Sequence, residues 1–434
     1  MKRISIFCLT ILIAASASAQ SYRIAGSKLS SYTIVYSSEA EDEVGMEAAL
    51  KLQKAIKDKT GTSINILSDN TKKASSKEIL IGKTNRSASL EAYRKDFGPF
   101  EYGAFVDKGS LVLCGGGCWA IDKAGELVTG QIAEGGIGSR YREEGSIEGE
   151  FLFDRDDDTN LRIFDDNVWD YNGATSPEIW NDLGVECTNA VRGPQFAQLV
   201  RAYMPDVMGF QEFSRQMTAV FKPLVEQYGY VEAFIPEGKN DTPLYYNSNT
   251  VELIDVNYVL YTPEMWSNNN SKSYTAGIFK LKENGRIFAL ISTHLWWKSE
   301  EVQPGSDLAR ASQVRLVMAQ AEAIKAKYDC PVFVVGDMNC TESSTAIRQF
   351  LDGGYKPCYK IATGSTDMHN GHHLCFPDRG FSRSGGDRTR TEAIDHCLLY
   401  NGGDTEIRNF KCEMAEFTIK LTDHYPNIVD VKLK

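Results

Sequence analysis

Apolar and polar residues alternate along the chain with two different periods, which separate strand-like from helix-like segments. In the first part, short apolar runs typical of strands are interleaved with segments in which apolar residues recur every three to four positions. Strands are expected at 32–36, 63–67 and 78–82, a hairpin at 103–115, and helices at 43–61 and 119–132. The hairpin turns at Asp107-Lys108-Gly109, which has the chemistry of a tight turn. This order predicts a small α/β domain over residues 20–135.

A break in the pattern separates this domain from a longer second part. Residues 136–158 are rich in glycine and charge and lack apolar periodicity, so they are interpreted as a linker. From residue 159 to 434 strands and helices alternate again, which indicates a second α/β domain. Strand-like runs lie at 161–169, 205–213, 331–337, 393–400 and 421–433, hairpins are expected at 243–254 and 277–297, and helices at 194–204 and 308–328.

Polar side chains of metal-ligand and acid–base types stand at the ends of these runs or within them. In PVFVVGDMN, for example, four apolar residues lead to Gly336, Asp337 and then Asn339. Ligands of open α/β sheets bind at the carboxyl ends of strands. A repeated polar residue at such ends therefore indicates a shared site more than a set of turns. The eight residues are Asn167, Glu212, His294, Asp337, Asn339, Asp395, Asp423 and His424.

The motifs around these residues resemble those of the endonuclease/exonuclease/phosphatase superfamily. This superfamily includes pancreatic-type DNases, abasic-site nucleases, neutral sphingomyelinases and inositol-phosphate 5-phosphatases. The matching segments, in the family's order, are DDNVW, DVMGFQE, STHL, VVGDMN, AIDHCLL and LTDHYP, supported by ARASQ and by Arg192. The resemblance implies an α/β fold, namely a four-layer α/β sandwich of two packed mixed β-sheets flanked by helices, behind the small α/β domain. It also implies hydrolysis of a phosphate ester.

A divalent cation is part of what the resemblance implies. Glu212 is the expected principal ligand of Mg²⁺ or Mn²⁺, with Asn167 and Asp423 close by. Mg²⁺ prefers hard carboxylate oxygens and retained water. Phosphoester hydrolysis depends mainly on charge stabilisation and on positioning of the attacking water. The alternative for Glu212 is a strand-end glutamate that forms a salt bridge.

A carboxylate–histidine pair is implied at Asp395 and His424. Asp395 would orient the imidazole and raise its pKa, so that His424 takes a proton from the attacking water. Asp337 is the other candidate for the base, and the sequence leaves this choice open. Asn339 is expected to donate a hydrogen bond to a phosphoryl oxygen. His294 is expected to stabilise the phosphoryl oxygens or to protonate the leaving group, and its alternative is a capped core residue.

Substrate choice is expected to lie in the loops. Neighbours on a strand point to opposite faces, so one of Trp296 and Trp297 is expected in the core. The other, taken as Trp297, is a candidate for stacking on a base or a sugar. The segment 362–391 is locally basic within an acidic domain, and its Arg379 and Arg383 are candidates for binding phosphate. The alternative for this segment is a solvated surface loop.

The small first domain shows no catalytic constellation. Its first helix, the segment EILIGKTNR and the hairpin followed by two glycines resemble domain 2 of family-20 glycoside hydrolases. The resemblance implies an accessory or spacer role.

The first nineteen residues have the pattern of a signal peptide. Lys2 and Arg3 precede an apolar run, and Ala17-x-Ala19 is a small-residue cleavage site. We therefore expect export, to the periplasm or the extracellular space, after cleavage near Ala19. No later apolar run is long enough for a transmembrane helix.

The charge balance bears on the partners of the second domain. The chain has a net charge of -11, and residues 151–434 hold 28 Lys and Arg against 39 Asp and Glu. A nucleic-acid-binding domain usually presents a basic surface. A secreted metal-dependent phosphoesterase acting on a small or lipid-borne phosphoester is therefore favoured. A secreted endonuclease acting on DNA or RNA and a non-catalytic carbohydrate- or ligand-binding protein are the alternatives.

Overall fold

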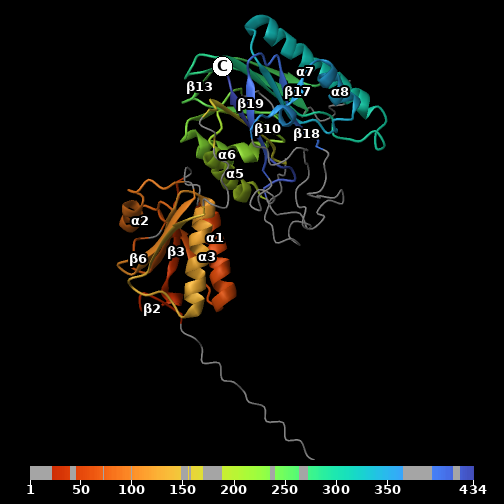
Figure 1. Ribbon diagram of the computed structural model, residues 1–434. Coiled ribbons are helices and arrows are strands. Elements are labelled where there is room, and N and C mark those ends of the chain that lie inside the picture. Colours follow the sequence, from red (N-terminus) through yellow and green to blue (C-terminus); the bar gives the residue numbers. More distant parts are fainter. Residues whose placement is uncertain are drawn as a thin grey trace, which may run out of the picture.

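The computed structural model has two regions, which we call the front region (residues 22–147) and the sandwich region (residues 158–434) (Figure 1). The described residues are 22–39, 45–71, 73–98, 100–147, 155, 158–169, 188–234, 240–262, 272–364, 393–413 and 421–434. Among the helices within these residues, none combines the length and the apolar character needed to cross a bilayer.

The front region is built on one six-stranded sheet in the order β4-β3-β5-β7-β6-β8. One sheet face is covered by α1 and α3, whose Leu52 and Val128 share a core with Ile34 and Leu113. The other face packs against α2. The elements are β1 (Arg23–Ile24), β2 (Ser27–Lys28), η1 (Leu29–Ser31), β3 (Thr33–Tyr36), α1 (Gly45–Thr60), β4 (Asn65–Ser68), β5 (Glu78–Ile81), α2 (Ser87–Ala92), β6 (Glu101–Asp107), β7 (Ser110–Gly115), α3 (Cys118–Glu134) and β8 (Arg142–Ser146).

Strand β8 lies within the segment 136–158 that the sequence suggests as a linker. It pairs antiparallel with β6, so the sheet of the front region extends to Ser146. The strand has the sequence REEGS and is mostly exposed as the edge of the sheet. Because both of its faces are polar, it has none of the apolar alternation by which a strand is found in a sequence.

The sandwich region contains two further six-stranded sheets. The first has the order β11-β12-β10-β9-β20-β19, and the second has the order β13-β14-β15-β16-β18-β17. The elements are β9 (Leu161–Asn167), α5 (Asn189–Tyr203), β10 (Val207–Gln211), α6 (Arg215–Glu226), β11 (Tyr230–Glu232), β12 (Leu244–Asn247), β13 (Val251–Leu260), β14 (Ser273–Leu281), β15 (Ile287–Thr293), α7 (Ser306–Tyr328), β16 (Val332–Asp337), α8 (Thr345–Asp352), β17 (Lys356–Pro357), α9 (Cys358–Ile361), β18 (Asp395–Tyr400), β19 (Glu406–Cys412) and β20 (Asn427–Lys432).

The two sheets pack face to face and are flanked by helices. Ile163 and Val207 of the first sheet share an apolar core with Leu290 and Phe333 of the second. A second core lies between the first sheet and the helices α5 and α6, and a third between the second sheet and the helices α7 and α8. In Figure 1, α7 and α8 lie on the side away from the front region, and α5 and α6 face it. The predicted four-layer α/β sandwich is confirmed.

One predicted hairpin is wrong, and another is confirmed. The run 243–254 was expected to fold on itself, but β12 pairs with β10 and β11 while β13 pairs with β14. The chain therefore crosses from one sheet to the other at the turn between β12 and β13. Alternating apolar residues on both sides of a turn predict strands but not their partners. The hairpin at Asn284-Gly285 is present as β14 and β15, with a φ of +72° at Gly285.

Gly336 allows β16 to approach the end of β15 closely. A Cβ atom at this position would lie 2.0 Å from the carbonyl oxygen of Thr293, and the residue has a φ of +133°. Both conditions exclude a side chain. This glycine thereby fixes the spacing between the residues that follow β15 and Asp337, the last residue of β16.

The front region is docked onto α5 of the sandwich region. The Oε1 atom of the buried Gln198 in α5 accepts hydrogen bonds from the backbone N–H of Trp119 at 2.7 Å and from Sγ of Cys118 at 3.1 Å. Arg201, one turn further on, donates to the carbonyls of Gly116 and Phe97. The first turn of α3 is thus capped by a side chain from the other region.

Candidate active site

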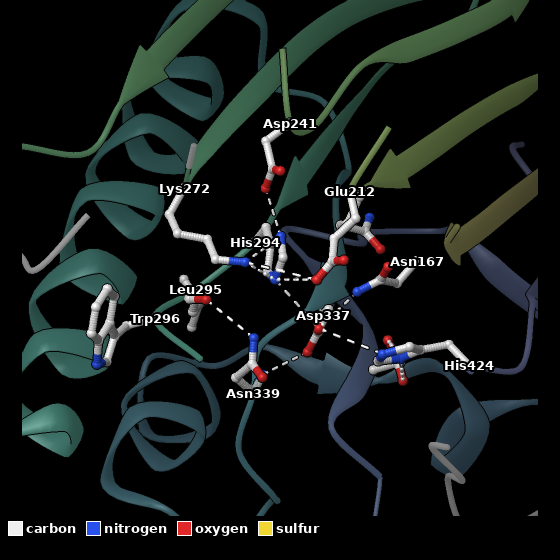
Figure 2. A network of polar contacts seen from close by, with 12 residues as sticks. Asn167, Glu212, Asp241, Lys272, His294, Leu295, Trp296, Asp337, Asn339 and His424 are labelled. Carbon is white, nitrogen blue, oxygen red and sulfur yellow. Dashed lines mark hydrogen bonds and ion pairs between the residues drawn. The ribbon is translucent and has the colours of Figure 1, made fainter. Parts of the chain in front are cut away.

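Strand ends from both sheets meet at one edge of the sandwich region (Figure 2). The parallel strands β9 and β10 end at Asn167 and one residue before Glu212. The parallel strands β15 and β16 end one residue before His294 and at Asp337. Strand β18 runs antiparallel to β16, so its first residue, Asp395, pairs with Asp337. The sheet topology therefore brings five of the predicted residues together.

Asp337 lies at the centre of the network (Figure 2). Its Oδ2 accepts a hydrogen bond from Nδ2 of Asn167 at 2.9 Å, and its Oδ1 accepts one from the N–H of Asn339 at 2.8 Å. The Nε2 atoms of His294 and His424 lie 3.4 and 3.8 Å from Oδ2. Burial raises the pKa of Asp337, but the hydrogen bond to His294 and the histidine charges outweigh burial and lower this pKa well below its usual range. Asp337 is therefore an ionised carboxylate between two imidazoles.

His424 is paired with Asp395, as predicted. Nδ1 of His424 donates to Oδ2 of Asp395 at 2.8 Å, and both side chains are buried. This leaves Nε2 facing Asp337 and 3.9 Å from Oδ1 of Asp423. Burial lowers the pKa of His424, but Asp395 and then Asp337 outweigh it and raise this pKa well above its ordinary value. His424 thus presents a protonatable nitrogen to two carboxylates.

His294 forms a second carboxylate–histidine pair, with Asp241. Its Nδ1 lies 2.6 Å from Oδ2 of Asp241, and the imidazole is fully buried. The Nζ atom of Lys272 lies 2.8 Å from Nδ1 and also contacts Nε2. Burial and the charge of Lys272 lower the pKa of His294, but Asp241 and Asp337 outweigh them and raise it to about 9. Asp241 and Asp337 thus favour the protonated form of the imidazole, against burial and Lys272.

Glu212 lies on the more exposed side of the cluster, with 27% of its side chain exposed. Its Oε1 lies 3.7 Å from Nε2 of His294 and 4.0 Å from Nζ of Lys272. Glu212 has a φ of +56° and Asn339 a φ of +52°, in the left-handed region that residues other than glycine rarely adopt. Such backbone conformations concentrate at functional sites. Here they occur one residue beyond the end of β10 and two residues beyond the end of β16.

Carboxylate and imidazole atoms form two groups with the composition of a metal site. In each group the ligand atoms lie within 4.8 Å of one another. The groups are Glu212, His294 and Asp337, and Asp337, Asp395 and His424. Asp423 lies next to them: burial raises its pKa, His424 lowers it, and the charge of Glu212 raises it again. An oxygen-rich, negatively charged cluster of this kind suits a hard divalent cation.

Two buried arginines hold the loops that carry the site. Arg192 of α5 donates to the carbonyl oxygens of Val168 at 2.5 Å and Leu421 at 2.9 Å. It thereby ties the residues that follow β9 to those that precede His424. Arg310 of α7, in the ARASQ motif, donates to the carbonyl of Trp296 at 3.0 Å. Arg192 and the ARASQ motif, which supported the resemblance in the sequence, therefore hold the loops of the site in place.

The substrate-binding candidates divide into two sets. Trp296 is buried and donates from Nε1 to Ser306, whereas 55% of Trp297 is exposed. One tryptophan is therefore in the core, as expected, although both lie beyond the end of β15 and not in a strand. Arg379 and Arg383 lie outside the described residues. The Nδ2 atom of Asn339, expected to contact a phosphoryl oxygen, donates to the carbonyl of Leu295 at 3.2 Å.

Sequence reasoning missed Asp241 and Lys272 because it considered only the ends of strands. Both residues precede strands, β12 and β14, which run antiparallel to neighbours that end at the site. A strand that runs antiparallel to its neighbour begins at the edge where the neighbour ends. Knowledge of these antiparallel partners would therefore have pointed to Asp241 and Lys272. Asp165 and Asp166 of β9 are two further buried carboxylates beside the site that the sequence did not single out. Burial raises the pKa of both well above the usual range.

The family profile of the endonuclease/exonuclease/phosphatase family matches residues 189–424. This match covers more than half of the chain, from the start of α5 to His424. The chain belongs to this family. It is accordingly a hydrolase of the class that includes phosphatases and nucleases. No curated protein matches the chain.

Solved structures of this fold resemble the sandwich region. A mannosyl-6-phosphatase of Bacteroides thetaiotaomicron VPI-5482 has 18% identity and a TM-score of 0.50, with 63% of this chain and 100% of that chain covered. The catalytic domain of human Nocturnin has 17% identity, a TM-score of 0.45, and coverage of 63% and 94%. A D. rerio TDP2 complex with a single-stranded DNA product has 15% identity, a TM-score of 0.46, and coverage of 63% and 99%. The first of these likenesses shows the fold.

Proposed function

We propose that the protein is an exported, divalent-metal-dependent phosphoesterase that hydrolyses a small or lipid-borne phosphate ester. The observation that carries this proposal is the ionised Asp337 between His294 and His424, each of which has its own carboxylate partner. Two oriented imidazoles beside one carboxylate supply proton transfer and charge stabilisation, the two demands of phosphoester hydrolysis.

A Mg²⁺ or Mn²⁺ ion fits the carboxylates on the exposed side of this cluster. Glu212 would be its principal ligand, with Asn167 and Asp423 nearby. The fit rests on the 4.8 Å grouping around Glu212 and on the raised pKa of Asp423, to which burial and then the negative charge of Glu212 contribute. When bound, such an ion polarises the phosphoryl oxygens and orients the attacking water. Proton transfer and the binding of the phosphoryl oxygens would be carried out by side chains of the protein.

The roles of these side chains follow from their hydrogen bonds. Nε2 of His424 is directed to the water by the Asp395 contact at Nδ1 and shares the task of base with Asp337. His294, kept protonated by Asp241, stabilises the phosphoryl oxygens or gives a proton to the leaving oxygen. Asn339 would donate to a phosphoryl oxygen in place of its hydrogen bond to the carbonyl of Leu295.

Small phosphoesters are favoured over nucleic acid on charge and on likeness. Residues 151–434 are acidic, with 28 Lys and Arg against 39 Asp and Glu. Acidic surfaces repel the phosphate backbone. The similar structure from Bacteroides thetaiotaomicron is a mannosyl-6-phosphatase, which adds sugar phosphates to the candidate substrates. The signal-peptide pattern of residues 1–19 supports export.

Hydrolysis by the mature protein tests this proposal. The assay compares p-nitrophenyl phosphate, bis-p-nitrophenyl phosphate, mannose 6-phosphate, sphingomyelin, DNA and RNA, each with Mn²⁺ or Mg²⁺ and again with EDTA. Activity on a small or lipid phosphoester that EDTA and Glu212→Gln both remove is the expected result. Activity that survives in EDTA or in Glu212→Gln contradicts the metal assignment. A preference for DNA or RNA moves the assignment to a nuclease.

A further inference from the structure

Lys272 is a buried lysine in the middle of the candidate site. Its side chain is 9% exposed, and its Nζ lies 2.8 Å from Nδ1 of His294 and 4.0 Å from Oε1 of Glu212. In Figure 2 it reaches toward both residues from the side opposite His424. It has no role in the chemistry described above. An ammonium group taken out of water needs compensating negative charge, so this position requires an explanation.

The backbone fixes Lys272 in relation to His294. The carbonyl of Lys272 accepts a hydrogen bond from the N–H of Tyr261 at 2.9 Å, and the next residue, Ser273, accepts one from the N–H of His294 at 3.1 Å. The amino end of β14 therefore holds Lys272 beside the residue that follows β15. Lys272 is part of the framework of the site and not of a surface loop.

Glu212 compensates part of the positive charge of Lys272, and a divalent cation bound to Glu212 would weaken this compensation. Glu212 forms an ion pair with Lys272, and the same carboxylate is the proposed principal ligand of the divalent cation. His294, a further close contact of Lys272, has a carboxylate partner of its own in Asp241. The ammonium group of Lys272 and the imidazole of His294 thus stand together on one side of the cluster. An oxyanion of the substrate is a group that both of them would attract.

We propose that Lys272, with His294, binds the non-bridging oxygens of a terminal phosphate and thereby makes the site selective for phosphomonoesters over phosphodiesters. The inference rests on the proposed function and narrows its substrate class. In the reaction, a water oxygen forms a bond to phosphorus as the ester P–O bond breaks. One water proton passes to the base, the leaving oxygen takes up a proton, and the products are an alcohol and inorganic phosphate.

The physical basis of the selectivity is the second negative charge of a monoester. The second pKa of a phosphomonoester is about 6, so the group is largely a dianion at neutral pH. A diester has one negative charge, and its second ester group replaces one of the non-bridging oxygens. In a bound diester, the second ester group would face Nζ of Lys272 in place of a charged oxygen. The buried ammonium group would then lose its partner, which weakens binding of the diester.

The test replaces Lys272 and follows both ester classes. Lys272→Met is assayed with Mn²⁺ on p-nitrophenyl phosphate and on bis-p-nitrophenyl phosphate, and inorganic phosphate binding is measured by isothermal titration calorimetry. Lys222→Met is the matched control, since Lys222 is a partly buried lysine paired with Glu232 outside the site. Lys272→Arg is the second variant and keeps the positive charge. We expect it to retain the preference for the monoester, which can be measured even if Lys272→Met does not fold.

We expect wild-type protein to prefer the monoester. Lys272→Met should lower kcat/KM for the monoester by about 100-fold while changing the diester value by about threefold or less. Its phosphate dissociation constant should rise by about tenfold or more. Equal losses on the two esters, unchanged phosphate binding, a diester preference in the wild type, or monoester preference lost in a folded Lys272→Arg would overturn the inference. Glu212→Gln separates the two proposals, because it should abolish both activities whichever ester is preferred.

Discussion

Both regions of the molecule place carboxylates at the ends of strands, but these carboxylates have different partners in the two regions. In the front region, Asp69 follows the parallel strand β4, next to the ends of β3 and β5. Its Oδ1 accepts from the N–H and the hydroxyl of Ser38 at 3.1 and 2.7 Å, and its Oδ2 accepts from the N–H of Asn85 at 2.8 Å. Backbone and side-chain donors thus satisfy this carboxylate and close the loops around it.

In the sandwich region, the strand-end carboxylates face one another. Asp337 and Asp395 are paired across β16 and β18, and Glu212 lies within reach of Asp337 and its histidine. Their neighbours are imidazoles and a lysine more than backbone donors. An acidic strand end is therefore structural where local N–H groups satisfy it, as at Asp69, and is a candidate for catalysis where several carboxylates converge with histidine.

The largest effect is expected at the centre of the cluster. Asp337→Asn removes the anion between His294 and His424, and hydrolysis should fall by about 1,000-fold or more. Steady-state kinetics measure the loss, and circular dichroism checks that the protein is folded. The exposed Asp352→Asn is the matched control and should keep wild-type activity. A folded, fully active Asp337→Asn protein would refute the assignment of this site.

The next effect is expected at the carboxylate–histidine pair. His424→Gln should lower kcat by about 100- to 10,000-fold, because it removes proton transfer at Nε2. His396→Gln is the comparison, since the Nε2 of His396 donates to the carbonyl of Cys340 at 2.8 Å and serves the fold. Kinetics on the best substrate should show a small change in His396→Gln. Equal losses in the two variants would mean that the pair is structural.

The sequence was most informative where strands end in polar residues. Asn167, Glu212, His294 and Asp337 each follow an apolar run. Parallel pairing joins them two by two, and the packing of the two sheets brings both pairs to one edge. Lys272 could not be found in this way, because it precedes a strand whose partner was unknown. Strand partners are set by tertiary packing, which also explains the wrong hairpin at 243–254.

A moderate effect on stability is expected in the front region. Asp69→Asn loses the charge that its three donors stabilise, which should lower the free energy of unfolding of this region by about 2 kcal/mol. Burial raises the pKa of Asp69, but the hydrogen bonds from Ser38 and Asn85 outweigh it and lower the pKa below its usual range. The wild type should therefore lose this contribution as pH falls through the folded-state pKa, and the variant should not.

Urea unfolding at pH 7 and at acidic pH measures this contribution, with the exposed Asp58→Asn as control. Hydrolysis should be unchanged in both variants. Lost activity in a stable Asp69→Asn protein would contradict the division between a structural and a chemical edge.

The smallest effect is expected where the two regions meet. Gln198→Ala removes the cap on the first turn of α3 and should destabilise this contact by about 1 kcal/mol. Faster hydrogen exchange at the amide of Trp119, with unchanged kcat, is the expected result. Gln131→Ala, on the exposed side of α3, should leave this exchange rate unchanged. A large loss of activity in Gln198→Ala would show that the front region takes part in catalysis.

Binding of Mn²⁺ tests the contrast between the two edges most directly. Electron paramagnetic resonance titrations on the wild type, Glu212→Gln and Asp69→Asn report bound and free Mn²⁺ without a substrate. The account predicts a Mn²⁺ site in the wild type that is retained in Asp69→Asn and is weakened by about tenfold or more in Glu212→Gln. Mn²⁺ binding that is unchanged in a folded Glu212→Gln protein, or that is lost in Asp69→Asn, would contradict it.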